Sequence, residues 1–245
     1  MKPKDQALRV WGDFACFSRP EMKVERFSYP VITPSAARGI FDAVYCKPKE
    51  FRWQITRVEV LKQPTFIALR RNEVKDKINH KTVAKWIKGT AEPEPIWADG
   101  DKGLLGTDMK GRTQRQTMAL KNVAYVLHAQ IHPWPDFAGR QQALEAQFRR
   151  RAAAGKCVWQ PYLGCREFPA FFELVEVGEP PPSTVDLDQD LGYMLYDVFD
   201  LSRPGDAFSL PSISLFQARI AGGVLDVPAY GSPEVVKVTG GVAHA

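Results

Sequence analysis

The chain contains 245 residues, of which 44% are hydrophobic and 25% are charged, and its formal net charge is +5. This composition excludes an intrinsically disordered chain and is typical of a soluble globular protein with a sizeable core. No apolar run approaches the roughly 20 residues of a membrane-spanning helix. The first ten residues lack the apolar segment of a signal peptide, so we expect a cytoplasmic protein with no membrane partner.

The charges are distributed unevenly along the chain. Residues 173–206 contain nine acidic residues and one basic residue, which gives −8 on this segment and +13 on the rest. A basic face of this kind is suited to a polyanion such as a nucleic acid, although an ordinary solubilising surface would have the same composition. The four cysteines have neither a disulfide-framework nor a zinc-ligand spacing, and we expect reduced, mostly buried thiols.

The first predicted elements are a strand and a helix. Residues 8–17 alternate between apolar and polar side chains, as in a half-buried strand. Thr33 and Pro34 are residue types that begin helices, at the N-cap and at the first helical position. The predicted helix ends at Tyr45 and has one apolar face, made of Ala37, Ile40, Phe41 and Val44.

The next segment predicts two strands, at residues 51–61 and 66–74, joined by a short turn. The stretch 75–111 is first lysine-rich and then rich in proline, glycine and aspartate, and we interpret it as a functional excursion from the core. A long strand is predicted at 118–132.

After this strand the pattern predicts a helix with Asp136 as its N-cap and Gly155 at its end. The last strand of this region is predicted at 168–177.

This order predicts an α+β fold with a ferredoxin-like (RRM-like) βαββαβ unit. We expect the N-terminal domain to cover residues 1–178, with a basic insert near 75–111. The proline-rich segment 179–184 is typical of a boundary, and 184–245 is predicted to be a small antiparallel β-domain.

Two histidines, His128 and His132, are predicted on the polar face of the long strand, because side chains alternate between faces with a period of two. Their segment lacks the glutamate of the zinc-protease motif and has no third ligand nearby, so no metal site is predicted. A face with histidine and basic side chains is suited to single-stranded RNA, and histidine can act as a general acid or base. The alternative is that both are ordinary surface residues of a sheet.

Tyr45 and Lys121 form a second candidate pair. A tyrosine at a helix end can position a ribose hydroxyl, or deprotonate it if a nearby cation lowers the phenol pKa from its usual value of about 10. Lys121 could supply that cation or stabilise negative charge on a phosphate. From these residues alone, Tyr45 is better explained as a helix-end aromatic residue with a hydrogen-bonded hydroxyl.

No phosphate-binding loop, dinucleotide fingerprint or paired carboxylates for two-metal chemistry are evident, so no cofactor is predicted. RNA can be cleaved without a metal when its 2′-hydroxyl attacks the neighbouring phosphate and gives a 2′,3′-cyclic phosphate. A protein then has to supply proton transfer and charge stabilisation.

Four segments carry a resemblance to a known family: KVERFSYPVITPSAARGIFDAVYCKP, FRWQITRVEVLKQP, LRRNEV and RTQRQTMALKNVAYVLHA. In this order, from about residue 8 to 177, the chain resembles the CRISPR-associated Cas-five family of subtype I-C, a RAMP-superfamily group. The resemblance implies a metal-independent endoribonuclease that cleaves the precursor transcript, pre-crRNA, at the repeat hairpin. It further implies that the protein stays on the crRNA 5′ handle as a subunit of the surveillance complex, Cascade.

The family's catalytic set is a tyrosine that ends the first helix and an adjacent lysine–histidine pair. Tyr45 and Lys121 match two of these positions, but Asn122 stands where the family has histidine. Either His128 takes over this role or catalysis is weaker. The expected RNA-binding residues are Arg38, Arg70, Arg71, Arg112, Arg115 and His132.

The alternative function is a non-catalytic subunit that binds the crRNA 5′ handle while another enzyme cleaves the transcript. The basic insert could also bind double-stranded DNA without sequence specificity, in which case binding would weaken steeply with salt.

Overall fold

The computed structural model describes residues 3–22, 24–74, 77–94, 112–176, 183–205 and 210–237. The chain forms two compact units, one of residues 1–67 with 118–245 and one of residues 68–117, and each is considered by itself. No helix within the described ranges is long and apolar enough to cross a membrane.

The larger unit is built on an antiparallel sheet around β5 (Arg112–Pro133), whose first residues belong to the smaller unit. β1 (Asp5–Ala15) and β3 (Phe51–Val60) pair with opposite edges of β5, and β6 (Phe171–Leu174) pairs with the free edge of β1. β2 (Arg26–Phe27) and β4 (Phe66–Val74) also pair with β5. The predicted N-terminal strands are therefore confirmed, with their ends shifted by a few residues.

Two α-helices of this unit begin in different ways. α1 (Pro34–Val44) starts as predicted, because the Thr33 hydroxyl accepts the backbone N–H of Ala36 at 3.3 Å. α4 (Gln141–Ala153) follows a 3-10 helix, η1 (Pro135–Arg140). The prediction of Asp136 as N-cap was wrong, since the two prolines before it favour a separate tight turn that takes up Asp136.

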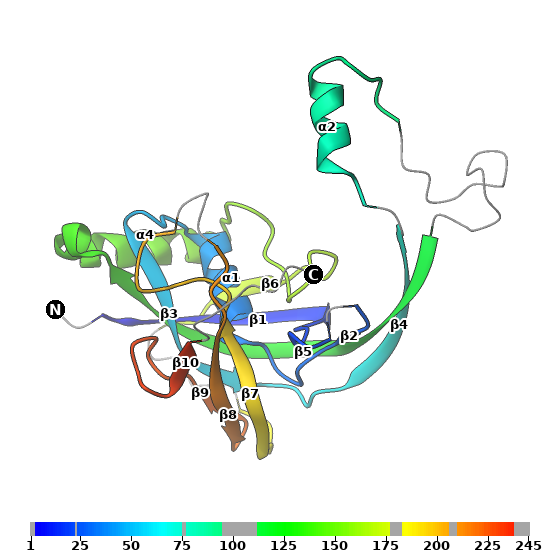
Figure 1. Ribbon diagram of the computed structural model, residues 1–245. Helices are drawn as coiled ribbons and strands as arrows, with labels where there is room; N and C mark the ends of the chain where they lie inside the picture. Colours follow the sequence, from blue (N-terminus) through cyan, green and yellow to red (C-terminus); the bar gives the residue numbers. More distant parts are fainter. Residues whose placement is uncertain are drawn as a thin grey trace. The chain divides into compact units, whose positions relative to one another are not determined.

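The core lies between the sheet and these two helices. The Trp53 ring of β3 is 4.9 Å from Phe41 of α1 and 4.7 Å from Phe148 of α4, measured between ring centroids. Both helices therefore pack on the same face of the sheet (Figure 1). All three rings are buried, and burying each contributes about 1.5–3 kcal/mol to folding.

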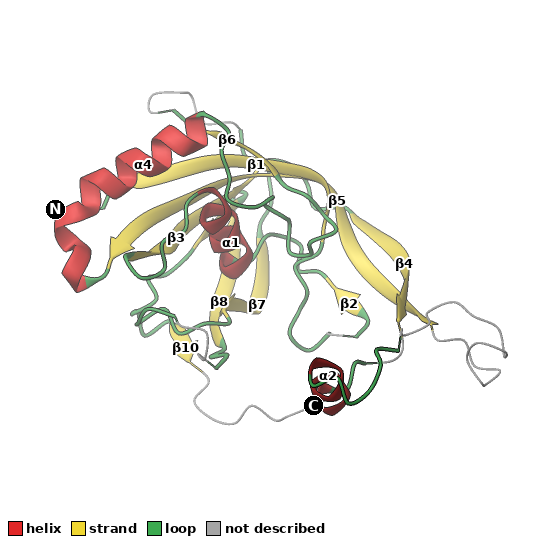
Figure 2. Cartoon of the chain, turned by 90° about the horizontal axis from the view of Figure 1, so that it is seen from above, coloured by secondary structure: helices red, strands yellow, loops and turns green. Residues whose placement is uncertain are grey.

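The C-terminal strands extend the same sheet rather than forming a second one. They are β7 (Gln189–Asp197), β8 (Ser214–Ala221), β9 (Val224–Asp226) and β10 (Val235–Lys237). β9 pairs with β3, which gives the order β10-β8-β9-β3-β5-β1-β6, and β7 pairs with β8. Figures 1 and 2 show β7 and β8 steeply inclined to β1 and β5.

The predicted domain boundary near 179–184 lies largely outside the described residues, so the division at residue 178 stays a prediction. The smaller unit contains most of β4, the start of β5 and α2 (His80–Ile87), which is capped by the Asn79 side chain at 2.9 Å from the Lys81 N–H. Residues 75–76 and 95–111 of the predicted insert are not described.

Candidate functional site

Tyr45 ends α1 and is 7% exposed. Its ring lies 5.3 Å from that of Phe51, and its carbonyl accepts the indole N–H of Trp53 at 3.0 Å. Burial raises the pKa of Tyr45 above its usual value, although Lys47, Arg140 and Arg151 act in the opposite direction. The phenol is therefore protonated at neutral pH, and it can donate a hydrogen bond or a proton but is not a base.

The basic side chains around Tyr45 come from α4, from η1 and from the turn after α1. Arg151 of α4 donates to the carbonyl of Val44 at 2.7 Å, at the end of α1. Lys47 and Arg140 both pair with Glu50, at 2.7 and 2.8 Å. The hydrogen bond from Lys47 lowers the pKa of Glu50. Three basic side chains, two of them paired with Glu50, therefore lie near the Tyr45 phenol, and such a group of cations is suited to binding a phosphate.

Lys121 lies in β5 opposite Phe14 of β1, and its side chain is exposed. Its N–H donates to the carbonyl of Thr65 at 2.9 Å, where β5 changes partner from β3 to β4. The next residue, Asn122, has a φ of 52°, a left-handed conformation that asparagine tolerates better than most residues.

The structure does not bring Tyr45 and Lys121 together. Tyr45 packs on Phe51, and Phe51 pairs with Pro133. Lys121 lies twelve positions before Pro133 in the same strand, which corresponds to about 40 Å measured along β5. Even with the curvature of the strand, the two side chains do not share one phosphate in this conformation.

His128 lies between two carboxylates on the face of the sheet opposite the helices. Its Nδ1 is 3.5 Å from Asp5 of β1, and its Nε2 is 3.2 Å from Glu59 of β3. Although burial acts to raise the pKa of Asp5, the hydrogen bond and charge of His128 lower it below its usual value. His128 is seven positions from Lys121, about 23 Å along the strand, so it is not an immediate substitute for a histidine next to Lys121.

His132 lies on the same face as predicted, paired with Arg52 of β3. Burial and the charge of Arg52 lower the pKa of His132, so its imidazole is neutral at pH 7. Arg52 donates to the side chain of Gln54 at 2.9 Å.

Arg38, predicted to bind RNA, is held in a buried ion cluster. Its guanidinium contacts Asp197 of β7 at 2.7 and 3.1 Å and Asp42 of α1 at 2.6 Å. Against the effect of burial, the two carboxylates raise its pKa. The cluster ties α1 to the C-terminal strands and leaves Arg38 less available to a ligand than a surface arginine.

The other four predicted RNA-binding arginines lie in the smaller unit, separate from the residues above. Arg70 on β4 is exposed. Arg71 contacts Glu73 at 3.0 Å, and Arg115 of β5 is 3.8 Å from the same carboxylate. Arg112 begins β5 and is half-buried.

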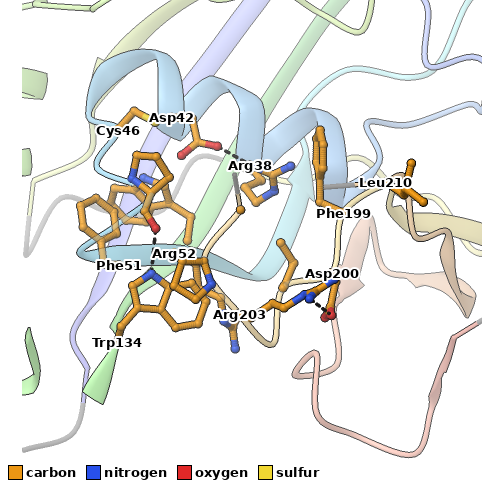
Figure 3. A pocket seen from close by; sticks show the side chains of 15 residues that line it. Arg38, Asp42, Cys46, Phe51, Arg52, Trp134, Phe199, Asp200, Arg203 and Leu210 are labelled. Atoms are coloured by element: carbon orange, nitrogen blue, oxygen red, sulfur yellow. Dashed lines mark hydrogen bonds and ion pairs between the residues drawn. The ribbon is translucent and has the colours of Figure 1, made fainter. Parts of the chain in front are cut away.

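A pocket of about 230 Å³ opens beside the end of α1 and the start of β3 (Figure 3). Arg38 and Arg52 contribute charge to its wall, and Trp134 is fixed there by its indole N–H, which donates to the carbonyl of Pro48 at 2.8 Å. Arg203 lies at the other side, 3.3 Å from Asp200. Cys46, the neighbour of Tyr45, also lines the pocket, and burial raises the pKa of its thiol to about 11.

Neither Arg52 nor Trp134 was predicted from the sequence as a site residue. Arg52 is one of several arginines in predicted strands, and nothing local distinguishes it. Trp134 stands between two prolines directly after a strand with two histidines, and a large aromatic residue in such a turn was an available signal.

The four cysteines are all free, but only Cys16 is buried, so the expectation of mostly buried thiols was wrong. Within the described ranges, no group of three or more histidine, cysteine, aspartate or glutamate side chains could hold a metal ion.

Comparison with known proteins identifies the class. A family model for CRISPR-associated proteins, Cas_Cas5d, matches residues 7–228, so the chain is a CRISPR-associated protein. A Mannheimia succiniciproducens protein is 38% identical over 93% of this chain and 96% of its own length, and a Thermus thermophilus protein is 39% identical over 96% of both chains. Both are named CRISPR pre-crRNA endoribonuclease Cas5d. The chain belongs to the Cas5d family.

Two solved structures are also similar in fold. The crystal structure of a CRISPR-associated protein has a TM-score of 0.61 at 20% identity, covering 96% of this chain and 97% of that one. A functionally uncharacterized protein from Streptococcus mutans has a TM-score of 0.58 at 19% identity with the same coverage. At these identities the likeness concerns the fold alone.

Proposed function

We propose that this protein is a pre-crRNA endoribonuclease that cleaves the CRISPR repeat at its hairpin in the cytoplasm and remains on the 5′ handle as a Cascade subunit. The observation that carries the proposal is 38–39% identity, over 93–96% of this chain, to two proteins named as pre-crRNA endoribonucleases. The proposed arrangement of the domain is ferredoxin-like, and the strand order β3-β5-β1-β6 around α1 and α4 supports it.

The proposed reaction needs no metal. The 2′-hydroxyl before the break attacks the adjacent phosphorus, the bond from phosphorus to the 5′-oxygen breaks, and the products carry a 2′,3′-cyclic phosphate and a 5′-hydroxyl. Tyr45, protonated because it is buried, would position the ribose hydroxyl or protonate the departing 5′-oxygen. Arg151 and Lys47, close to Tyr45, would stabilise the charge on the phosphate.

Lys121 and His128 complete the proposed catalytic set, but their positions along β5 favour a division of roles. A bound hairpin extends over tens of ångströms, so one RNA can contact Tyr45 at one end of the strand and Lys121 towards the other. In this arrangement Tyr45 acts at the phosphate that breaks, and Lys121 raises the rate by holding the RNA in the geometry for cleavage rather than by touching that phosphate. The proposed RNA-binding residues are the arginines of the smaller unit, Arg70, Arg71, Arg112 and Arg115, with Arg38 and His132 in the larger unit.

A second candidate function is favoured by two specific observations. Tyr45 packs on Phe51 at the Pro133 end of β5, far from Lys121 in the same strand. In addition, Asn122 stands in place of the histidine of the family set. Both observations fit a subunit that binds the 5′ handle without cutting. In this second proposal the basic insert would add nonspecific binding of double-stranded DNA.

Incubation of the purified protein with its repeat RNA in EDTA separates the two functions. Product with a cyclic phosphate end is expected for the nuclease. Tight binding of an RNA that stays intact would support the non-catalytic subunit instead.

A further inference from the structure

The pocket beside Tyr45 has the size and walls of a site for one flat, aromatic ligand group. Its volume of about 230 Å³ is below the roughly 300–1,000 Å³ of sites for drug-sized ligands. Four aromatic side chains line it, namely Phe51 and Trp53 of β3, Trp134 after β5 and Phe199 after β7 (Figure 3). Its apolar lining further includes Pro48, Leu201, Pro204 and Leu210.

Three arginines line the pocket, and they differ in whether they are available to bind an anion. Arg38 is bound by Asp42 and Asp197, and Arg203 is bound by Asp200. Arg52 differs, because its described hydrogen bond goes to the neutral amide of Gln54 and its guanidinium lies 5.9 Å from the Tyr230 ring, while Asp197 acts on it only through its charge and not through an ion pair among the described residues. A half-buried guanidinium without a carboxylate in direct contact is a strong receptor for a phosphate.

The pocket is also preorganised. Asp197 accepts the backbone N–H groups of Val198 and Phe199, at 2.7 and 2.9 Å, in addition to the Arg38 guanidinium. The buried ion cluster therefore holds the start of the segment that carries Phe199. On the opposite side, Trp134 is fixed through its side chain to Pro48 and through its backbone N–H to the Glu50 carbonyl at 2.9 Å.

We propose that this pocket captures one unpaired nucleotide of the repeat RNA, with its base stacked on Trp134 and a flanking phosphate on Arg52. The inference rests on the proposed function and deepens it. Aromatic faces accept any base by stacking, and Arg52 supplies the charge that the sugar-phosphate backbone requires. Phe51 lines the pocket and its ring also contacts that of Tyr45, so a nucleotide held here would bring the neighbouring backbone to the end of α1, where Tyr45 lies.

The test uses repeat RNAs in which each unpaired position in turn carries 2-aminopurine or an abasic sugar. We expect one position at which 2-aminopurine fluorescence is quenched on binding and at which the abasic sugar weakens binding about tenfold. In Trp134→Ala we expect that 2-aminopurine is no longer quenched and that the abasic sugar no longer weakens binding. Trp134→Phe, which keeps an aromatic face, restores most of the affinity and serves as the check that the site remains folded.

Matched controls exist for both ligand contacts. Trp159 is 43% exposed and does not line the pocket, so Trp159→Ala leaves quenching and penalty unchanged. Arg52→Gln weakens binding about tenfold, whereas Arg57→Gln, on the same strand and paired with Asp226 at the surface, does not.

The outcomes distinguish this inference from the proposed function. If the wild-type protein binds and cleaves the RNA but no position is coupled to Trp134, the pocket proposal is overturned and the nuclease proposal stands. If the wild-type protein neither binds nor cleaves the repeat RNA, the proposed function fails, and this inference with it. A pocket that receives a side chain of a partner protein instead would give intact RNA binding in both Trp134→Ala and Arg52→Gln.

Discussion

The Tyr45→Phe substitution removes a single oxygen atom from a side chain that is 7% exposed and stacked on Phe51. The ring keeps its packing, so the change in stability should be within the roughly 0.5–1.5 kcal/mol of one hydrogen bond. A shift of this size lowers the melting temperature of a chain of this length by about 1–6 °C. A loss of proton transfer, in contrast, lowers the rate of cleavage by about 10²–10⁴-fold.

The assay is single-turnover cleavage of the repeat RNA, with hairpin affinity measured in parallel. We expect Tyr45→Phe to lower the cleavage rate at least tenfold and to leave affinity nearly unchanged. Tyr193→Phe is the matched control, because Tyr193 is 60% exposed and lines neither the pocket nor the Tyr45 region. Since the pKa of Tyr45 is raised, its acid form persists up to and beyond pH 10, and its ionisation causes no change in rate between pH 6 and 9. An unchanged rate in Tyr45→Phe would refute the role of the phenol.

Three further predictions concern other parts of the chain. Lys121→Ala lowers the single-turnover cleavage rate at least tenfold and leaves hairpin binding nearly intact. In the double variant with Tyr45→Phe the two rate effects multiply, because the residues are far apart. A double variant that is no slower than the slower single variant would instead place both residues at one phosphate. Asp197→Asn disrupts the buried ion cluster and costs about 3 kcal/mol, or about 6–12 °C in melting temperature. Asp226→Asn, at a 76% exposed position, stays within about 0.5 kcal/mol, and equal shifts in the two variants would contradict a stabilising role of the cluster. Arg70→Gln weakens RNA binding and reduces the slope of log affinity against log salt by about 0.7–1, and an unchanged slope would exclude a phosphate contact.

The elements that the sequence predicted well are those fixed by local patterns. Thr33 and Pro34 mark the start of α1 because capping depends on residues within one turn. Gly155 ends α4 for the same reason, with a φ of 62° that other residues adopt at a cost. The placement of both histidines on one face of β5 follows from the two-residue period of a strand.

The features that could not be predicted depend on contacts between distant parts of the chain. Arg38 and Asp197 are 159 residues apart, so nothing near Arg38 in the sequence indicates that its charge is already compensated. The pairing of β9 with β3, which joins the C-terminal strands to the main sheet, is also a long-range contact. Arg52 becomes a candidate phosphate-binding residue only when its neighbours Gln54 and His132 are seen to be uncharged.

The separation of Tyr45 from Lys121 is another feature that could not be predicted from the sequence. A resemblance can align single positions, but the distance between them depends on the length of β5 and on where α1 ends against it. The sequence therefore indicated candidate residues for the site and left their geometry open.

The most direct test of RNA cleavage by its own 2′-hydroxyl is a repeat RNA with one deoxyribose on the 5′ side of the break. In EDTA we expect the all-ribose RNA to be cut to a 2′,3′-cyclic phosphate product and the substituted RNA to be bound with similar affinity but left intact. Cleavage of the substituted RNA at the same rate would contradict the proposed mechanism.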